Sequence, residues 1–405
     1  MTNRSPALAF VLVTILIDTI GFGIIIPVVP ELIMELTGEP LSRAAEYSGW
    51  LMLLFASVNF LAMPVLGNLS DRYGRRPVLL LSLTMLGLNT LLMGLATSIL
   101  WLFVGRILSG AAAASFSTAN AYVADISTPD NRAQNFGMIG AAFGAGFVLG
   151  PALGGLLGEL GPRVPFFVAA ALSALNVAYG WFVLPESLRP EHRRAFEWRR
   201  ANPLGALAAL RRYPVVSGLV VVIALYQLAF QVMPSVWSFY SMRAFAWSEA
   251  DVGLSMAFTG VLMIAVQAGL VRRAIPALGE HRAALLGIAL AAIGHLAYAF
   301  ASVGWMAYAA AIPAALSGLV SPALNAIMSR QVGPAGQGEL QGAIGSVVSL
   351  TAIVGPFLMT QLFSTFTRPG APVDFPGAPF IASAVLMAVA LLLLARRPQA
   401  RPEAG

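Results

Sequence analysis

The chain has 405 residues, of which 58% are hydrophobic and only 10% are charged, and its mean hydropathy is +0.79. A soluble protein normally carries about 25% charged residues, so the composition excludes an ordinary soluble domain and indicates an integral membrane protein. The absence of cysteine excludes disulfides, thiol chemistry and cysteine-ligated metals. The net charge is +6, and all 24 basic residues are Arg. The Arg residues gather between hydrophobic stretches, so membrane topology explains the positive charge better than a nucleic-acid partner does.

Twelve apolar segments are long enough to cross a bilayer as helices, and the first is expected to be a retained span. They cover residues 7–33, 47–69, 77–97, 100–124, 135–158, 165–185, 215–241, 250–272, 283–301, 304–329, 339–363 and 378–395. Very short turns join spans three and four, and spans nine and ten, which predicts antiparallel hairpins. The fold class expected is an all-α membrane protein with twelve transmembrane helices.

The longest polar gap, 186–214, is rich in Arg and Pro and separates two sets of six spans. We therefore expect an N-terminal six-helix bundle over 1–185, a cytoplasmic linker over 186–214 and a C-terminal six-helix bundle over 215–405.

The placement of Arg predicts the orientation in the membrane. With the N-terminus inside, four of the 24 basic residues fall in outside loops and one lies within a span, while the remainder fall on the inner side. Cytoplasmic loops carry the excess of basic residues, so we expect both termini in the cytoplasm and the chain in the cytoplasmic (inner) membrane. The outside residues are Arg43, Arg163, Arg243 and Arg368.

Asp18 lies near the middle of the first span, which Gly21, Gly23, Pro27 and Pro30 soften. A charge at membrane depth costs at least a few kcal/mol, so such a residue is a functional-site hypothesis by default. Asp18 is either a buried polar group that fixes helix packing or a protonatable coupling site, and we favour the second.

A weak internal repeat relates the two halves at an offset of about 205–208 residues. Gly137, Gly140, Gly150 and Pro151 in span five match Gly342, Gly345, Gly355 and Pro356 in span eleven. Leu108-Ser-Gly110 matches Leu316-Ser-Gly318, and Pro27 matches Pro234. A parallel repeat of this kind is typical of transporters with a substrate site between the halves.

The turn between spans two and three reads G-x-x-x-D-R-x-G-R-R, which an excess of inner Arg alone does not explain. It resembles the signature loop of the major facilitator superfamily, which latches the two halves in the outward-open state. The residues concerned are Gly67, Asp71, Arg72, Gly74, Arg75 and Arg76, and we expect Asp125 of span four to join them. The second half has Gly279 at the matching position, followed by Glu280 and His281, so the latch is expected to be one-sided.

Arg106 is the one cation placed inside a span. It either snorkels to the outer interface or pairs, directly or through water, with Asp18. Loss of water favours a protonated carboxyl, whereas a nearby cation favours the ionised one, and a site balanced between them can load and release a proton. An Arg in span four is also part of the proton-antiporter pattern in drug exporters, which the sequence resembles.

Span five contains closely spaced small residues that let helices approach one another. Ordinary helix packing explains part of this pattern, but G-x-x-x-G-P-x-x-G-G also resembles the antiporter motif of drug-exporting facilitators. The motif residues are Gly146, Gly150, Pro151, Gly154 and Gly155.

The order of motifs over nearly the whole chain resembles the tetracycline-efflux branch of these twelve-span drug:proton antiporters. Three positions depart from that branch: Asn89 and Ala291 stand where the tetracycline pumps carry acids, and Met263 where they carry a His. These losses favour lipophilic neutral or weakly basic substrates over a metal–tetracycline cation.

Polar side chains within spans are expected either to join helices or to contact substrate. The substrate-cavity set is Asn59, Asn89, Asn120, Tyr226, Gln227, Gln231, Trp237, Asn325 and Gln341. His295 is expected to be structural, and no spacing among the 3 His suggests a metal site.

We therefore expect no enzyme but a proton-coupled antiporter that exports drug-like amphiphilic compounds by alternating access, with Asp18 as the protonation site. Its expected partners are the substrate, protons and the bilayer, with no nucleic acid, no cofactor beyond the proton gradient, and a monomeric state. The alternative is a metabolite or lipid transporter of the same fold, an uptake symporter or uniporter.

Overall fold

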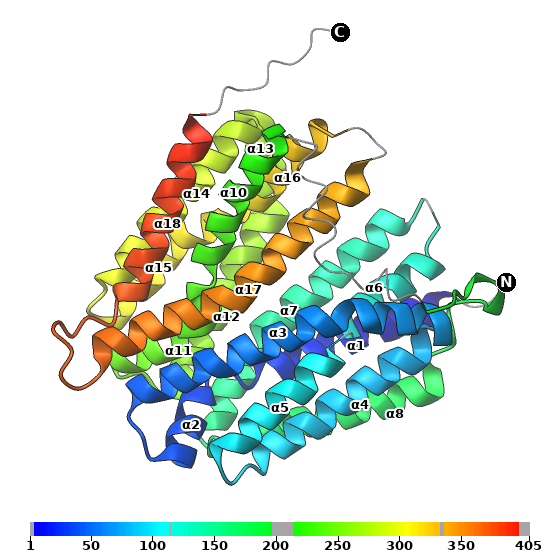
Figure 1. Cartoon of the computed structure of the whole chain (residues 1–405), viewed down its shortest axis with the longest axis horizontal. Helices are drawn as coiled ribbons and strands as arrows, with labels where there is room; N and C mark the ends of the chain where they lie inside the picture. The colour runs from blue at the N-terminus through cyan, green and yellow to red at the C-terminus, as the bar shows by residue number, and fades with distance from the viewer. Residues whose placement is uncertain (1–3, 114, 129, 197–213, 333–335, 397–405) are drawn as a thin grey trace, which may run out of the picture. The chain divides into compact units, whose positions relative to one another are not determined.

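A computed structural model describes residues 4–113, 115–128, 130–196, 214–332 and 336–396 (Figure 1). Within these ranges the regular elements are helices. Contacts divide the chain into two units, the first comprising Met1–Pro203 and Trp247–Gly260 and the second Leu204–Ala246 and Val261–Gly405.

The helices of the first unit lie along the predicted spans, two of which are interrupted. They are α1 (Arg4–Gly23), α2 (Val29–Thr37), α3 (Leu41–Tyr73), α4 (Arg75–Gly94), α5 (Ile99–Ala112), α6 (Ser115–Ile126), α7 (Arg132–Gly158), α8 (Val164–Val183) and the short η1 (Pro190–His192).

The second unit begins with α10 (Pro214–Phe230) and α11 (Val232–Phe245). It continues with α12 (Glu249–Ala265), η4 (Val266–Leu270), α13 (Val271–Leu278), α14 (Glu280–Ala299), α15 (Gly304–Ala315), η5 (Leu316–Leu319), α16 (Val320–Arg330), α17 (Gln337–Thr367) and α18 (Ala378–Ala395). The first part of α12, up to Gly260, packs in the first unit.

The predicted all-α membrane fold is confirmed. Eleven helical stretches of the described chain are long and apolar enough to cross a membrane, and Leu8–Gly23 is a shorter apolar helix. The expectation of one continuous helix over 7–33 is wrong, since α1 ends at Gly23 and α2 begins at Val29. Pro27 lies in the intervening turn, where a proline cannot continue the hydrogen-bond ladder.

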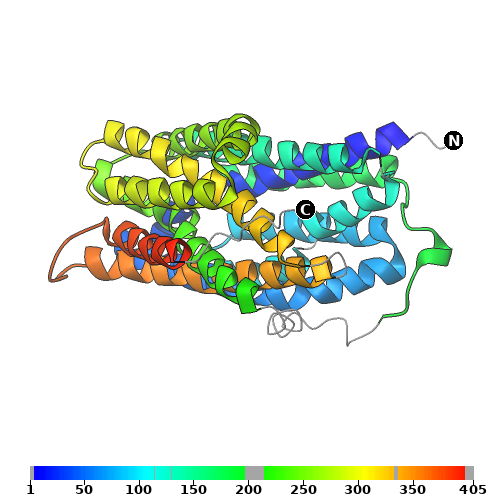
Figure 2. The ribbon, with the colours of Figure 1, turned by 90° about the horizontal axis from the view of Figure 1, so that it is seen from above.

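Both units use the same helix pairs, as expected for a parallel repeat. In the first unit α1 packs on α7 and α8, α3 on α5, and α4 on α8. In the second, α10 packs on α17 and α18, η4 on η5, and α14 on α18. Figures 1 and 2 show α4 beside α8 and α14 beside α18. The repeated helix pairing therefore follows the repeat in the sequence.

Each unit has its own buried core. In the first, Phe10, Leu79 and Tyr122 are fully buried between α1, α4 and α6. In the second, Ile288 and Leu324 represent a larger core formed by α10, α14, α16, α17 and α18.

The predicted domain boundaries stay a prediction. Residues 197–213 of the predicted linker lie outside the described residues. Of the remainder, the backbone N–H of Arg194 donates to the carbonyl of Asp71 at 3.1 Å, so the described part of the linker lies against the end of α3.

Candidate functional site

Asp18 lies in the last part of α1 and faces the start of α6. The Ser115 hydroxyl donates a hydrogen bond of 2.6 Å to Oδ2 of Asp18. The other oxygen, Oδ1, is buried and has no hydrogen-bond partner in the described part of the chain. The site therefore holds one oxygen of Asp18 and leaves the other available.

Arg106 lies in α5 and does not contact Asp18. Its guanidinium carbon is 5.8 Å from the ring centroid of Phe55 in α3, within the range of a cation–π interaction. Its Nε is buried and has no hydrogen-bond partner among the described residues. The direct pair predicted between Arg106 and Asp18 is thus absent from the described structure. Ser115 instead donates a hydrogen bond to the Asp18 carboxylate.

The fourth predicted span is divided into α5 and α6. The first helix ends at Ala112 and the second begins at Ser115, while Ala113 has φ −75° and ψ 57°, outside the helical region. The Asn59 side-chain amide of α3 donates to the Ala113 carbonyl at 3.4 Å. This bond gives the Ala113 carbonyl a side-chain partner at the interruption, and Ser115 of α6 contacts Asp18.

The glycine row of α7 lets this helix approach α1 closely. A Cβ on Gly150 would lie 2.9 Å from the Cα of Gly23 and 3.0 Å from the carbonyl oxygen of Ile20. A Cβ on Gly146 would lie 2.6 Å from the Thr19 Cβ, and one on Gly154 would overlap the Ile24 carbonyl. The α1–α7 distance therefore requires glycine at these three positions.

The opposite flank of α7 contacts the first part of α12. A Cβ on Gly155 would overlap the carbonyl oxygen of Glu249, and one on Gly253 would overlap that of Pro151. The motif residues of α7 thus fix two helix contacts within the first unit, which is the packing role that the sequence suggested. Their antiporter role stays a prediction.

The predicted latch loop joins α3 to α4 and contains a network of ionic contacts. Arg75 Nη1 donates to Asp71 Oδ1 at 2.6 Å and to the Ser70 hydroxyl at 2.7 Å. Its Nε donates to Asp125 Oδ2 of α6 at 3.2 Å. The structure thus brings Asp71, Arg75 and Asp125 together, as the sequence predicted for Asp125.

The remaining loop residues shape the turn. Gly67 accepts the Ser70 hydroxyl through its carbonyl at 3.0 Å. The guanidinium carbon of Arg72 lies 5.1 Å from the ring centroid of Tyr73. Arg76 Nη2 donates to the carbonyl of Trp181 in α8 at 2.7 Å. The loop is therefore tied both to its own helix and to the end of α8.

Glu186 is the residue of this network that the sequence reasoning missed. Its carboxylate accepts the backbone N–H groups of Arg75 at 2.8 Å and Arg76 at 3.2 Å, the first of α4. A Cβ on Gly74 would collide with it, and Gly74 has φ 109°, so only glycine fits. The signal in the sequence was a single acid directly after span six.

The second unit carries an ion pair between the corresponding helices, α14 and α16, with the order of its charges reversed. Glu280 Oε1, at the start of α14, binds Arg330 Nη2, at the end of α16, at 2.6 Å. In the first unit, Arg75 starts α4 and Asp125 lies near the end of α6. This pair contains no counterpart of Asp71, in whose place, 205 residues further on, stands Pro276, so the one-sided latch stays a prediction.

The predicted substrate-cavity residues of the first unit lie between helices. Besides Asn59, Asn89 is buried in α4 against Gly105 of α5, and its Oδ1 has no hydrogen-bond partner in the described chain. Asn120 is half-buried in α6. None of these observations tests substrate contact, which stays a prediction.

In the second unit, several of the predicted residues join helices. The Tyr226 hydroxyl donates to the Ser317 carbonyl at 3.0 Å, and the Gln231 amide to the Thr351 carbonyl at 3.4 Å. Asn325 has a buried Oδ1 with no partner among the described residues. Gln227 is half-buried and Gln341 is exposed.

Trp237 is buried in an aromatic cluster rather than exposed. Its ring centroid lies 5.0 Å from that of Tyr298 and 6.2 Å from that of Phe380. His295 lies beside this cluster, and its Nδ1 is 2.7 Å from the Ser383 hydroxyl, which donates to the Ala229 carbonyl at 2.8 Å. His295 thus links α14, α18 and α10, in line with a structural role.

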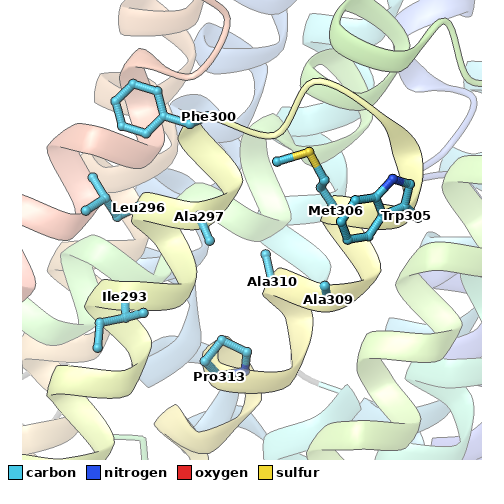
Figure 3. A pocket seen from close by; sticks show the side chains of 9 residues that line it. All are labelled: Ile293, Leu296, Ala297, Phe300, Trp305, Met306, Ala309, Ala310 and Pro313. Atoms are coloured by element: carbon cyan, nitrogen blue, oxygen red, sulfur yellow. The ribbon is translucent and has the colours of Figure 1, made fainter.

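An apolar groove of about 510 Å³ lies between the end of α14 and α15. Nine apolar residues line it, including the exposed Phe300 and Trp305 (Figure 3). It contains none of the predicted site residues. The described residues also contain no group of three or more His, Asp or Glu that could hold a metal ion.

Two repeated helical units and a carboxylate at membrane depth define the class of this protein as a transporter built from parallel repeats. Residues 11–356 match the family model of the Major Facilitator Superfamily. The chain therefore belongs to the major facilitator superfamily.

Among its relatives, tetracycline resistance protein class C of Escherichia coli is 38% identical over 97% of this chain and 98% of that protein. Multidrug resistance protein 2 of Bacillus subtilis is 30% identical over 89% of this chain and 90% of its own length. The resemblance to the tetracycline-efflux branch is confirmed by these relatives. The structure of the human organic anion transporter MFSD10 is similar in fold, with a TM-score of 0.71 and 23% identity over 97% of this chain and 100% of that one.

Proposed function

We propose that the protein is a proton-coupled antiporter that exports drug-like amphiphilic compounds by alternating access. The observation that carries this proposal is Asp18, a carboxylate in the first span with one oxygen bound by Ser115 and the other without a hydrogen-bond partner among the described residues. A charge at this depth is costly, and acids that are retained within membrane spans commonly take part in proton relays. The relatives named for tetracycline and multidrug resistance support export of drugs.

The departures at Asn89 and Ala291 bear on the substrate. Both residues are buried, Asn89 at 4% and Ala291 at 0% exposure, and neither carries a charge that could bind a metal-chelated compound. We therefore propose neutral or weakly basic amphiphiles as the main substrates, held mostly by apolar contacts.

The proposed location is the cytoplasmic (inner) membrane with both termini on the cytoplasmic side. The described Arg residues at the α3–α4 turn and after α8 lie at one end of the first unit, which the positive-inside rule assigns to the cytoplasm. We also propose that a monomer is sufficient for transport.

The test is a compound panel that includes tetracycline and ethidium, measured in everted membrane vesicles with and without a protonophore. Wild type should accumulate one or more compounds only with a proton gradient. Asp18→Asn keeps an acceptor for Ser115 but cannot exchange a proton, so gradient-driven accumulation should fall at least a hundredfold, on the order of 3 kcal/mol in barrier. Arg106→Ala should lose most of the activity as well.

Glu31→Gln is the matched control, because it neutralises an acid in α2, beyond the Pro27 turn. It should transport at nearly the wild-type rate. Normal gradient-driven efflux by Asp18→Asn would overturn the assignment of the protonation site. Absence of any gradient-dependent transport by wild type would instead favour a metabolite or lipid transporter.

A further inference from the structure

We infer that Ser115 is the positioning residue for Asp18: its hydroxyl holds the carboxylate in its ionised form and thereby sets the pH at which the transporter exchanges protons. The inference rests on the proposed function and deepens it, since it assigns to a neutral side chain the place that Arg106 was expected to fill. It follows from the contact between α1 and the first residue of α6.

The contact between Ser115 and Asp18 is short and directional. The 2.6 Å bond from the Ser115 hydroxyl to Oδ2 lies in the range of charge-assisted O–H···O⁻ bonds. A hydroxyl that donates to a carboxylate stabilises the charged form more than the neutral one.

Other charged groups on the helices that pack against α1 have partners elsewhere. On α6, the Tyr122 hydroxyl donates to the Pro185 carbonyl and Asp125 binds Arg75. On α7, Arg132 lies over the ring of Phe136, and on α8 the ring of Tyr179 packs against Phe10. These four residues are the charged or titratable side chains within α6, α7 and α8.

Two further observations narrow the choice to Ser115. The residues of α7 that face this part of α1 include Gly146 and Gly150, which have no side chain to donate a bond. Arg106 on α5 lies against Phe55. Among the described residues, Ser115 is therefore the side chain that donates a hydrogen bond to Asp18.

The arrangement also identifies the oxygen that receives the proton. Oδ1 of Asp18 is buried with no hydrogen-bond partner in the described chain, whereas Oδ2 is occupied. A proton added to Oδ1 converts the carboxylate to a neutral acid, and the Ser115 hydroxyl keeps its own proton. The charge-assisted bond then becomes a weaker neutral bond, so Ser115 opposes protonation until the pH on the accessible side is low enough.

The test compares the pH profiles of gradient-driven transport by wild type, Ser115→Ala and Ser115→Thr in everted vesicles. The probe is a compound that wild type transports, tetracycline or ethidium. Ser115→Ala should move the midpoint to higher pH by about one unit, a roughly tenfold change in proton affinity, because the ionised form loses its donor. Ser115→Thr keeps the hydroxyl and should return the midpoint to the wild-type value.

Thr84→Val is the control for loss of a hydroxyl in the same unit, since Thr84 donates to the Leu80 carbonyl of its own helix. Its pH profile should match that of wild type. An unchanged midpoint for Ser115→Ala, with transport retained, would overturn the role of Ser115 and leave the proposed function intact. If Ser115→Ala is poorly folded, the test rests on Ser115→Thr, whose pH profile should have the wild-type midpoint. A shifted midpoint in Ser115→Thr would also overturn the role of Ser115.

Discussion

Glu186 holds the first turn of α4 through its side chain, although it lies outside the signature loop. One carboxylate oxygen accepts the N–H groups of Arg75, Ser187 and Leu188 at 2.8 to 3.0 Å, and the other accepts Arg76 at 3.2 Å. The first N–H groups of a helix have no partner within the helix, and a carboxylate is a favourable cap for them. The loop geometry therefore depends on a residue beyond span six.

We predict that Glu186→Gln slows transport without weakening substrate binding. Glutamine keeps one acceptor oxygen but turns an NH₂ donor toward the N–H groups of α4, so Arg75 is no longer held toward Asp71 and Asp125. The maximal rate in everted vesicles should fall about threefold to tenfold at an unchanged KM.

The control is Glu191→Gln, which removes an exposed acid a few residues further on in η1. It should leave both kinetic constants as in wild type. A rise in KM for Glu186→Gln at constant maximal rate would contradict a role in the conformational step.

At the residue scale, the sequence alone identified residue types that are rare within or beside membrane spans. The free-energy cost of placing a charge in the membrane is independent of the fold, so such residues stand out before the structure is known. Asp18 and the α3–α4 loop are of this kind. It could not predict Ser115 or Glu186 as partners, because many other Ser residues are candidates and the pairing joins segments 97 and 111 residues apart. For the same reason the sequence offered Arg106 as a direct or water-mediated partner of Asp18, with snorkelling to the outer interface as the alternative.

At the scale of helices, the reversed ion pairs show how two similar units can differ in sequence and still use one contact. Arg75 with Asp125 joins α4 to α6, and Glu280 with Arg330 joins α14 to α16. A motif search finds only the first pair. The contact depends on opposite charges at two positions, and either order of charges satisfies it.

We predict that transport tolerates an exchange of the two charges in the Glu280–Arg330 pair but not the presence of two like charges. Arg330→Glu places two acids together and should slow transport severalfold, whereas the double variant Glu280→Arg with Arg330→Glu should recover most of the rate. Arg330 is 74% exposed, so folding stability should change by less than about 1 kcal/mol.

The measurement is a double-mutant cycle on transport rate, with thermal unfolding of each purified variant as the control for stability. Equal rates for the single and double variants would show that the contact has no part in the cycle.

Helix positions followed from hydrophobic length, whereas helix breaks did not. The predicted 378–395 coincides with α18, because apolar length is a local property. The interruption near Ile24–Val28 contains Pro27, a local signal, whereas the one at Ala113 lies beside a neighbouring helix, from which the Asn59 amide donates to the Ala113 carbonyl. Periodicity in one segment contains no information on such neighbours.

At the scale of the whole chain, the repeat is visible in packing as well as in sequence. Gly150 approaches α1 in the first unit, and Gly355 approaches Gln231, between α10 and α11, in the second. Gly110 packs on α3 and Gly318 on η4, which again are equivalent contacts. By contrast, a Cβ on Gly137 or Gly140 would meet no atom within 4 Å, so only part of the glycine repeat reflects close approach.

An even number of spans places both ends of the chain on the same side of the membrane, and the Arg distribution decides which side. We predict that the α3–α4 loop and the segment after α8 face the cytoplasm, while the loop between α17 and α18 faces outward. The chain contains no cysteine, so single introduced cysteines report their positions without background. Glu191 is exposed after α8, and Val373 is 59% exposed between α17 and α18.

A membrane-impermeant maleimide should label Glu191→Cys in everted vesicles and leave it unlabelled in right-side-out vesicles. Val373→Cys should show the opposite pattern, and each variant serves as the control for the integrity of the other's vesicles. Labelling of both positions from one side would require an even number of spans between them and would contradict the predicted topology. Reversal of both labelling patterns would instead show that the orientation in the membrane is inverted. The prediction is strict because η1 and the α17–α18 loop are separated by α10 through α17, and each helical span between them changes the side.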